Sequence, residues 1–329
     1  MFYKSCDWIS GGLDFRQSSV VLCCFTYMQG YDEYELIPDY HGEKINWTDL
    51  FRKKHELIER QKADNPADFC NNCIYLTERD WVDDDTINCM IFNHWTNCNS
   101  ACIYCYFGQN HDYYNKQPYY DIVPVLEDME ANGILKVVQG SFVSFGGGEP
   151  TLLKDFDKIL NILKRNRFPK IRINSSGIKY SEPIVNGLAD NTFNVCISPD
   201  AGSREKYRQI KRVDCFENVW NNIAKYVQSA ANTNDVKVKY IIIPDVNDTQ
   251  KDIDDFFAMA EKTGVTSVCL SVDKTWTADL DEKIKEPKEL EIFELMKSFE
   301  NTAKARNLDF EMYSEGLAFK NFLEKKYKF

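Results

Sequence analysis

Apolar and polar residues alternate in a regular way along most of the chain. From residue 86 onward, short apolar runs that suit buried strands are separated by stretches with helical periodicity, such as 152–166 and 215–232. The expected strands are 86–92, 141–145, 171–174, 193–198, 236–243 and 265–272. Strands that alternate with helices predict an α/β fold, with a parallel sheet closed or partly closed as a barrel and helices outside. In such folds the chemistry lies in loops at the carboxyl ends of the strands.

The pattern differs on both sides of this region. Residues 1–85 look irregular, with a strand expected in 18–25 and a helix in 46–62 whose apolar stripe contains Leu50, Phe51, His55 and Ile58. After residue 275 we expect a helix over 288–306, a strand within 308–314 and a short last helix. The expected domains are therefore 1–85, 86–275 and a C-terminal helical extension, 276–329, packed on the barrel.

Composition narrows the class of protein. The formal net charge is −11 and the pI is about 5.0, so the chain as a whole lacks a basic footprint for nucleic acid. No apolar window approaches the length of a membrane helix, and the N-terminus lacks the apolar segment of a signal peptide. We expect a cytoplasmic protein that binds neither nucleic acid nor membrane. In that compartment, clustered cysteines indicate metal or redox chemistry.

Three cysteines follow the first expected barrel strand. Cys98, Cys102 and Cys105 are spaced Cys-x-x-x-Cys-x-x-Cys, with Tyr104 immediately before the third. A structural zinc site would need a fourth ligand, for which His94 or His111 is available. Three thiolates fit better with a cubane iron–sulfur cluster that leaves one iron without a protein ligand and open to a small molecule.

This loop resembles the signature of the radical S-adenosylmethionine (radical SAM) enzymes. The resemblance implies a partial (β/α)6 TIM-type barrel and a [4Fe–4S] cluster on Cys98, Cys102 and Cys105, whose open iron chelates the methionine end of S-adenosylmethionine. It also implies reductive cleavage of S-adenosylmethionine to a 5′-deoxyadenosyl radical, which takes a hydrogen atom from a substrate.

Further segments match this family in the same order along the chain. Gly147-Gly148-Glu149-Pro150 matches its Gly-Gly-Glu-Pro motif, which receives the methionine amino group; without a ligand this would be a tight strand-to-helix turn. The other segments that resemble cofactor-contacting parts supply Tyr104, Asn174, Ser175, Ser198, Arg212 and Ile243. Arg212 belongs to a basic run with Arg204, Lys206, Arg208 and Lys211, which by default is a solvated helix face. One member of this run is expected to pair with the cofactor carboxylate, and the sequence does not single it out.

Five cysteines precede the barrel. The spacing of Cys6 and the adjacent Cys23 and Cys24 resembles the start of the auxiliary-cluster modules called SPASM or twitch, although those modules normally follow the barrel. With the pair Cys70-x-x-Cys73, a second iron–sulfur cluster on Cys6, Cys23, Cys70 and Cys73 is expected, and structural zinc is the alternative. Three cysteines within expected strands are interpreted as core packing: Cys89, Cys196 and Cys269.

Only the resemblance to the radical SAM family gives an indication of the substrate. Auxiliary clusters favour oxidative modification or crosslinking of a peptide, and the alternative is a carbohydrate or another small molecule. Epimerisation would need a thiol such as Cys24 or Cys215, and Asp273 at the end of the sixth strand is a candidate substrate contact. The expected partner is an electron donor such as flavodoxin or ferredoxin. A hypothesis of another class is a non-catalytic zinc or iron–sulfur scaffold, although such a scaffold has no use for a methionine pocket.

Overall fold

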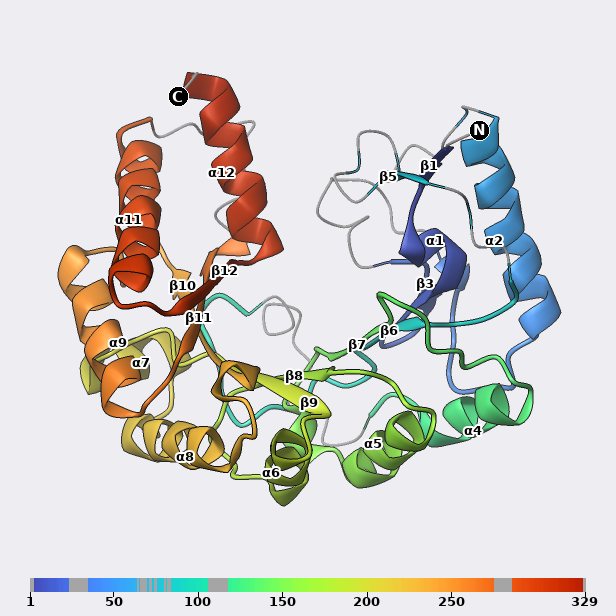
Figure 1. Ribbon diagram of the computed structural model, residues 1–329, viewed down its shortest axis with the longest axis horizontal. Coiled ribbons are helices and arrows are strands. Elements are labelled where there is room, and N and C mark those ends of the chain that lie inside the picture. The colour runs from blue at the N-terminus through green and yellow to red at the C-terminus, as the bar shows by residue number, and fades with distance from the viewer. Residues whose placement is uncertain are drawn as a thin grey trace. The chain divides into compact units, whose positions relative to one another are not determined.

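The computed structural model describes residues 3–23, 35–63, 65, 70, 73, 76–79, 81, 84–105, 118–274 and 286–327. The chain forms two compact units, Met1–Asn97 with Tyr114–Arg172, and Cys98–Tyr113 with Ile173–Phe329 (Figure 1). Cys24 and His111 lie outside the described residues.

The first unit contains a sheet with the strand order β7-β6-β2-β3-β4. Strand β6 pairs in parallel with β2 and β7, whereas β3 is antiparallel to its neighbours. The strands are β2 (Gly12–Phe15), β3 (Val20–Val21), β4 (Glu35–Ile37), β6 (Cys89–Phe92) and β7 (Phe142–Phe145), with β1 (Tyr3–Ser5) and β5 (Thr77–Arg79) forming a separate antiparallel pair. The helices are α1 (Asp7–Gly11), α2 (Trp47–Lys62), α4 (Val123–Ala131), the 3-10 turn η3 (Pro150–Leu152) and α5 (Phe156–Arg165).

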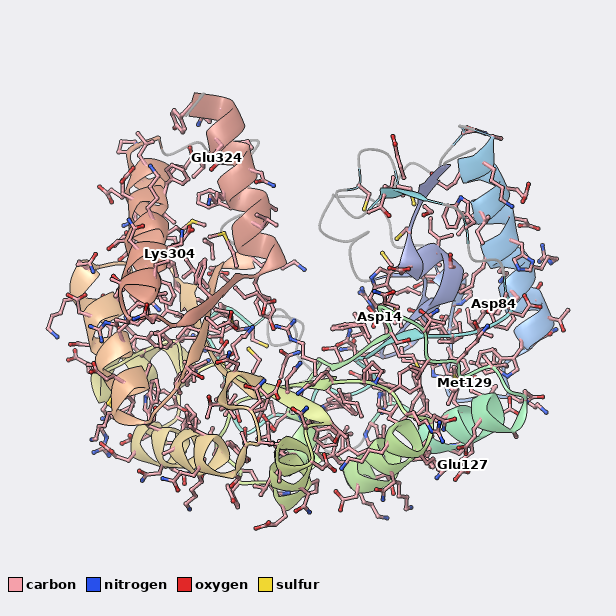
Figure 2. The ribbon with its side chains drawn as sticks, in the orientation of Figure 1. Asp14, Asp84, Glu127, Met129, Lys304 and Glu324 are labelled. Atoms are coloured by element: carbon pink, nitrogen blue, oxygen red, sulfur yellow. The ribbon has the colours of Figure 1, made fainter. Side chains whose placement is uncertain are left out.

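The core of the first unit follows from its apolar runs. Every side chain of β2 and β6 is buried, as expected of parallel strands covered on both faces. The helices are amphipathic: on α4, Met129 is buried and Glu127 is exposed (Figure 2). The segment before residue 86 is thus more regular than its sequence pattern predicts, because β2 pairs with β6.

The helix expected at 46–62 forms as α2, but its buried face differs from the predicted stripe. Lys54 is buried, and its ammonium donates to the carbonyl oxygens of Trp8, Ile9 and Gly12 at 3.1, 3.1 and 2.7 Å. His55 lies half-exposed instead and contacts Asp85 at 3.1 Å. The prediction that His55 lies on the buried face of this helix was wrong. Lys54 is buried instead, because its ammonium forms hydrogen bonds with carbonyl oxygens around the end of α1.

The second unit carries the strand order β12-β11-β10-β9-β8. The pairs β9/β10, β10/β11 and β11/β12 are all parallel. The strands are β8 (Ile171–Ser175), whose first two residues are assigned to the first unit, β9 (Phe193–Ile197), β10 (Val236–Ile242), β11 (Ser267–Val272) and β12 (Asp309–Met312). The helices are α6 (Glu182–Ala189), α7 (Arg204–Lys211), α8 (Phe216–Ser229), η4 (Thr233–Asp235), α9 (Gln250–Lys262), α11 (Glu286–Ala305) and α12 (Ser314–Tyr327).

Helices follow the parallel strands of the second unit and cover them from outside (Figure 1). An aromatic group formed by Trp220, Tyr240, Phe256 and Phe299 packs between helices and strands. The α/β class is therefore confirmed, and all six expected barrel strands form within a few residues of their predicted bounds. The expected domain boundaries at residues 85 and 275 stay predictions. No helix in the described part of the chain is long and apolar enough to cross a membrane.

Candidate functional site

The three-cysteine loop is attached to the end of helix α7 in the second unit. Ala101 N donates to Lys211 O and Ile103 N donates to Ile210 O, each at 3.0 Å. The last carbonyls of a helix have no partner within the helix, so this loop satisfies them and is held in place by them. Cys98, Cys102 and Cys105 are half-buried and form no disulfide.

Beneath the loop lies a group of three polar side chains, in which Asp200 and Lys211 are buried and Tyr104 is half-buried. Tyr104 donates its hydroxyl to Asp200 Oδ2 at 2.5 Å, and Lys211 Nζ lies 2.6 Å from the Tyr104 oxygen. Lys211 also forms an ion pair with Asp200, and the residues are 2% and 0% exposed. Tyr104, predicted to contact the cofactor, thus directs its hydroxyl into this group.

The electrostatic environment of Cys102 is set mainly by burial. Burial raises the pKa of the Cys102 thiol, and the Lys211 ammonium acts in the opposite direction. Burial and the Asp200 carboxylate raise the pKa of Tyr104 well above its ordinary value, so this phenol stays protonated. A thiolate that binds iron would therefore form next to a cation.

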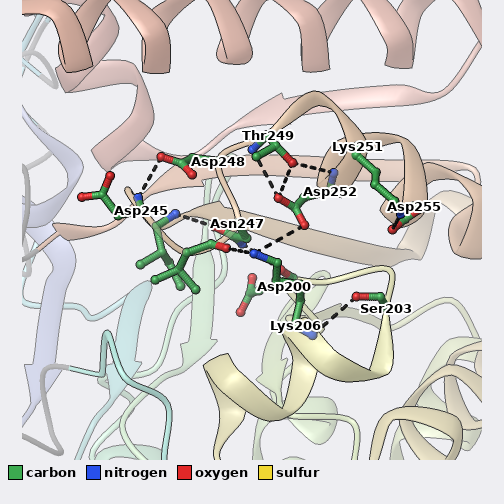
Figure 3. A network of polar contacts seen from close by, with 12 residues as sticks. Asp200, Ser203, Lys206, Asp245, Asn247, Asp248, Thr249, Lys251, Asp252 and Asp255 are labelled. Atoms are coloured by element: carbon green, nitrogen blue, oxygen red, sulfur yellow. Dashed lines mark hydrogen bonds and ion pairs between the residues drawn. The ribbon is translucent and has the colours of Figure 1, made fainter.

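The buried side-chain amide of Asn247 links Asp200 to the edge of β10 (Figure 3). Asn247 Nδ2 donates to Asp200 O and Ile241 O, both at 2.9 Å, and its Oδ1 accepts from Ile243 N at 2.7 Å. Asp200 Oδ1 in turn accepts from Ile241 N at 3.0 Å. Ile243, predicted to pack on the cofactor, is buried at this edge.

The other predicted residues at strand ends have defined partners. Asn174 Oδ1 accepts from the Tyr313 hydroxyl at 3.0 Å, and Ser175 Oγ accepts from Gly177 N at 3.0 Å. Ser198 N donates to Ser175 O at 3.3 Å, so β8 and β9 end side by side. Asp273 is buried directly after β11, where its N–H donates to Ile242 O at 2.9 Å.

The basic run of α7 separates into different environments. Arg204 forms two hydrogen bonds with Asp214, at 2.8 and 2.7 Å, and Arg208 lies 3.8 Å from the same carboxylate. Lys206 bonds to a backbone carbonyl (Figure 3), and Lys211 is buried. Arg212 is exposed and has left-handed backbone, with φ 56°. The default expectation that this basic run is a solvated helix face is therefore wrong for Lys211. In the structure Lys211 lies one helical turn after the buried Tyr207, on the same face of α7.

The glycine turn belongs to the first unit and lies against the segment that leads into the three-cysteine loop. Gly148 N donates to Trp95 O at 3.0 Å, and Glu149 N donates to Asn97 O at 2.8 Å. Gly147 has φ +70°, and a Cβ there would lie 2.6 Å from Trp95 O. A Cβ on Gly148 would lie 2.2 Å from Asn97 O. Side chains are thus excluded at both positions by backbone that immediately precedes Cys98.

Glu149 and Pro150 begin the short turn η3. The Glu149 side chain is buried and accepts from Thr151 N at 3.2 Å and from the Thr151 hydroxyl at 2.6 Å. Pro150 occupies the first helical position, where its missing N–H costs nothing. Both residues therefore shape the turn.

The four N-terminal cysteines lie in one region of the first unit. The pKa of the Cys70 thiol is raised to about 12, first by burial and then by the charges of Cys6, Cys23 and Cys73. Burial also raises the pKa of Cys6, whereas the backbone N–H groups of α1 act in the opposite direction. Cys73 N donates to Cys70 O at 3.2 Å, which closes the Cys-x-x-Cys turn.

The remaining cysteines and His94 have structural surroundings. Cys89, Cys196 and Cys269 are buried, as the packing interpretation predicted, and Cys215 is half-buried at the start of α8. His94 is buried among aromatic rings, and burial lowers its pKa to about 3.

Neither cysteine set forms a compact site for one ion. Among the described residues, no three His, Cys, Asp or Glu side chains are grouped so that they could hold a single metal ion. In a cubane cluster each thiolate binds a different iron atom, so its ligands are spread more widely than those around one ion. Three thiols in a short loop held by α7 fit such a group.

Comparisons with known proteins identify the family of the chain. The family model described as the Radical SAM superfamily matches residues 92–260. A GTP 3′,8-cyclase of Clostridium botulinum is 28% identical over 171 residues, which is 50% of this chain and 50% of that protein. The chain thus spans about half the length of this curated relative.

Solved structures share the fold at low sequence identity. Streptococcus suis SuiB bound to S-adenosylmethionine gives a TM-score of 0.53 at 13% identity, covering 83% of this chain and 57% of that one. SuiB bound to the precursor peptide SuiA gives 0.53 at 12% identity, covering 95% and 73%. These matches bear out the partial TIM-type fold.

Proposed function

The chain belongs to the radical SAM superfamily, and we propose that Cys98, Cys102 and Cys105 hold its [4Fe–4S] cluster. The observation that supports this proposal is the loop itself, which has three thiols in the family's spacing and is held to α7 by two backbone hydrogen bonds. When bound, a cluster on these thiolates would supply the electron that cleaves a C–S bond of S-adenosylmethionine to methionine and a 5′-deoxyadenosyl radical, and that radical would take a hydrogen atom from the substrate to give 5′-deoxyadenosine.

Residues around the strand ends would bind S-adenosylmethionine. Gly147 and Gly148 are half-exposed and carry no side chain, which suits the approach of the methionine amino group to their backbone. The edge residues Ser198 and Ile243 would contact the cofactor, with Asn174 and Ser175 on the neighbouring strand. Arg204, Arg208 and Arg212 are all exposed, but Arg204 and Arg208 pair with Asp214, so we assign the cofactor carboxylate to Arg212.

The proposed substrate is a peptide, modified oxidatively. Support comes from the N-terminal cysteine set, because auxiliary clusters in this superfamily accompany oxidative peptide chemistry, and from a fold shared with a protein bound to a precursor peptide. A small molecule is the second candidate, since one similar curated protein is a GTP 3′,8-cyclase. Asp273, buried at the end of β11, is the proposed substrate contact in either case.

We also propose a second iron–sulfur cluster on Cys6, Cys23, Cys70 and Cys73. The mutual effect of these thiols on the pKa of Cys70 supports their proximity. A second cluster would accept the electron left on the substrate after hydrogen abstraction, which balances an oxidative reaction. The first electron would come from a one-electron donor such as flavodoxin or ferredoxin.

Cofactor cleavage tests the function directly. Anaerobically purified and iron-loaded protein, reduced with dithionite in the presence of S-adenosylmethionine, should release 5′-deoxyadenosine, measured by chromatography. The triple variant Cys98→Ala, Cys102→Ala, Cys105→Ala should release none, whereas Cys196→Ala, which alters a core thiol, should retain the activity. Equal cleavage by the triple variant would refute the assignment of the cluster, and an iron-free, zinc-loaded wild type would refute the function.

A further inference from the structure

Strand β2, which lies outside the family match, brings a buried carboxylate to the end of β6. Asp14 is fully buried, and its side chain accepts from Asn93 Nδ2 at 2.8 Å and from Arg16 Nε at 2.9 Å. Asn93 directly follows β6, and its N–H donates to Phe15 O at 2.8 Å, so β2 and β6 end side by side. A buried carboxylate is costly unless it is paired and hydrogen-bonded, and both conditions are met here.

Asn93 in turn fills the space beside the glycine turn. Gly146 N donates to Phe92 O at 3.0 Å, which brings the start of the turn next to Asn93. A Cβ on Gly146 would lie 2.3 Å from Asn93 Oδ1, and a Cβ on Gly147 would lie 3.3 Å from Asn93 Cα. Gly146 does not have left-handed backbone, so its own conformation does not require a glycine. The Asn93 oxygen therefore explains why a third glycine precedes the Gly-Gly-Glu-Pro motif.

The Asp14 carboxylate determines which way the Asn93 amide points. An ionised carboxylate only accepts hydrogen bonds, so it pairs with the NH2 group of the amide and not with its oxygen. The oxygen is thereby turned towards Gly146. If Asp14 were absent, the Asn93 side chain could rotate, and the glycine turn would lose a fixed neighbour on this side.

We propose that Asp14 is a positioning residue for the cofactor: through Asn93 it fixes the glycine turn in the form that receives the methionine end of S-adenosylmethionine. The inference rests on the proposed role of Gly147 and Gly148 in cofactor binding. It gives β2 a part in the cofactor site, although this strand precedes the region that the family match covers.

The dissociation constant (Kd) of S-adenosylmethionine tests the proposal, measured by calorimetry with anaerobic, iron-loaded protein whose clusters are oxidised, so that no cofactor is cleaved. Asp14→Ala should raise the Kd about tenfold, the order expected when one supporting buried hydrogen bond is lost. Asn93→Ala should raise it by a similar factor, and both variants should keep the iron content of the wild type. Glu130→Ala removes a carboxylate that bonds Arg165 elsewhere in the first unit, and this control should bind as the wild type does.

Two double variants distinguish positioning from a general loss of stability. If Asp14 acts through Asn93, the variant Asp14→Ala, Asn93→Ala should bind no more weakly than Asn93→Ala alone, whereas independent structural effects would multiply. Gly146→Ala should also raise the Kd, because its Cβ meets the Asn93 oxygen. Gly146→Ala, Asn93→Ala should again bind no more weakly than Asn93→Ala alone, since that oxygen is gone.

The proposal is overturned if Asn93→Ala or a folded Asp14→Ala binds S-adenosylmethionine with the wild-type Kd, or if the effects of Asp14→Ala and Asn93→Ala multiply in the double variant. Asn93→Ala leaves the ion pair of Asp14 with Arg16 in place, so it carries the test if Asp14→Ala does not fold. Failure of the proposed function gives a different result, because the wild type would then not bind S-adenosylmethionine, and the inference would fall with it.

Discussion

Gly147 is required for two independent reasons, its left-handed backbone and the absence of room for a Cβ. Sequence comparison attributes this glycine to the approach of a ligand, whereas the structure shows the space occupied by the carbonyl oxygen of Trp95. The two explanations are compatible, because a turn packed against the segment before Cys98 also fixes the orientation of the cluster loop. They nevertheless predict different effects of substitution on stability.

We expect Gly147→Ala to lower the free energy of unfolding by more than the roughly 1–2 kcal/mol that left-handed backbone costs an alanine. The excess comes from the clash with Trp95 O, 2.6 Å from the added Cβ. Gly133→Ala is the matched control, since Gly133 has φ +66° and nothing within 4 Å of its Cβ. Chemical unfolding of the two iron-free variants gives the comparison, and equal losses would mean that contact with Trp95 imposes no constraint.

The buried His94 should make the stability of the folded chain depend on pH. Burial lowers its pKa to about 3, so between this value and about 6.5 the unfolded chain binds a proton that the folded chain does not. Stability therefore rises with pH across this window and is lost as the pH falls. From pH 6.5 to 5 the contribution amounts to roughly 1.5 kcal/mol of the free energy of unfolding.

His94→Phe should flatten the acid side of the pH–stability curve of the iron-free chain by that amount, measured by denaturant unfolding. His41→Phe, which replaces a histidine at an exposed position, is the control variant. An unaltered slope in His94→Phe would show that His94 is accessible to protons in the folded protein.

Among elements, the turn after β10 depends on one side chain. Asn247 is fully buried, and its amide joins the backbone of Asp200, Ile241 and Ile243 (Figure 3). Asn247→Ala would leave buried donors and acceptors without partners, each costing about 1–3 kcal/mol. We expect a loss of at least about 2 kcal/mol in the free energy of unfolding, together with weaker S-adenosylmethionine binding because Ile243 is released.

The matched control is Asn218→Ala, which removes an amide that bonds Ile178 O at 2.6 Å from an exposed position. Water can replace that partner, so the loss should stay well below that of Asn247→Ala. If thermal unfolding shows that Asn247→Ala and Asn218→Ala lose similar stability, burial of the Asn247 amide does not determine its contribution.

The sequence identifies elements well where burial alone decides them. The runs at 193–198 and 236–243 become β9 and β10 almost unchanged, because continuous apolar strands suit a covered parallel sheet. The run at 86–92 is too long by the residues before Cys89, since Ile87 makes only an isolated bridge with Leu135. Periodicity failed at Lys54 and Lys211, which are buried through hydrogen bonds and an ion pair with residues distant in sequence.

Strand β2 shows another limit of sequence patterns. Nothing in the four residues Gly12–Phe15 reveals that they pair in parallel with β6, because the pairing partner lies far along the chain. The cysteine spacing, by contrast, is a local signal, and for that reason the loop at Cys98 could be singled out before the fold was known. The Tyr104–Asp200–Lys211 group is non-local and became visible only in three dimensions.

At the scale of the whole molecule, the chain joins a family-typical barrel region to a cysteine-bearing N-terminal segment. The family match covers residues 92–260, which leaves Cys6, Cys23, Cys70 and Cys73 outside it. Lys54 lies near this set: burial lowers its pKa to about 7, and the charges of Cys6 and Cys23 act in the opposite direction. Thiolates bound to iron or zinc would therefore favour the protonated form of this lysine.

The double variant Cys70→Ala, Cys73→Ala decides what this segment does. It removes both thiols of one turn, so a cluster bound there should be lost, and iron per chain should fall by about one cluster's content. Cleavage of S-adenosylmethionine without substrate should persist, because Cys98, Cys102 and Cys105 are intact, whereas turnover of the true substrate should stop for want of an electron acceptor. Cys89→Ala, which alters a core thiol of β6, is the control and should retain all iron. If elemental analysis instead finds zinc in the wild type, absent from the double variant while iron is unchanged, the four cysteines form a structural site and the oxidative part of the proposal fails.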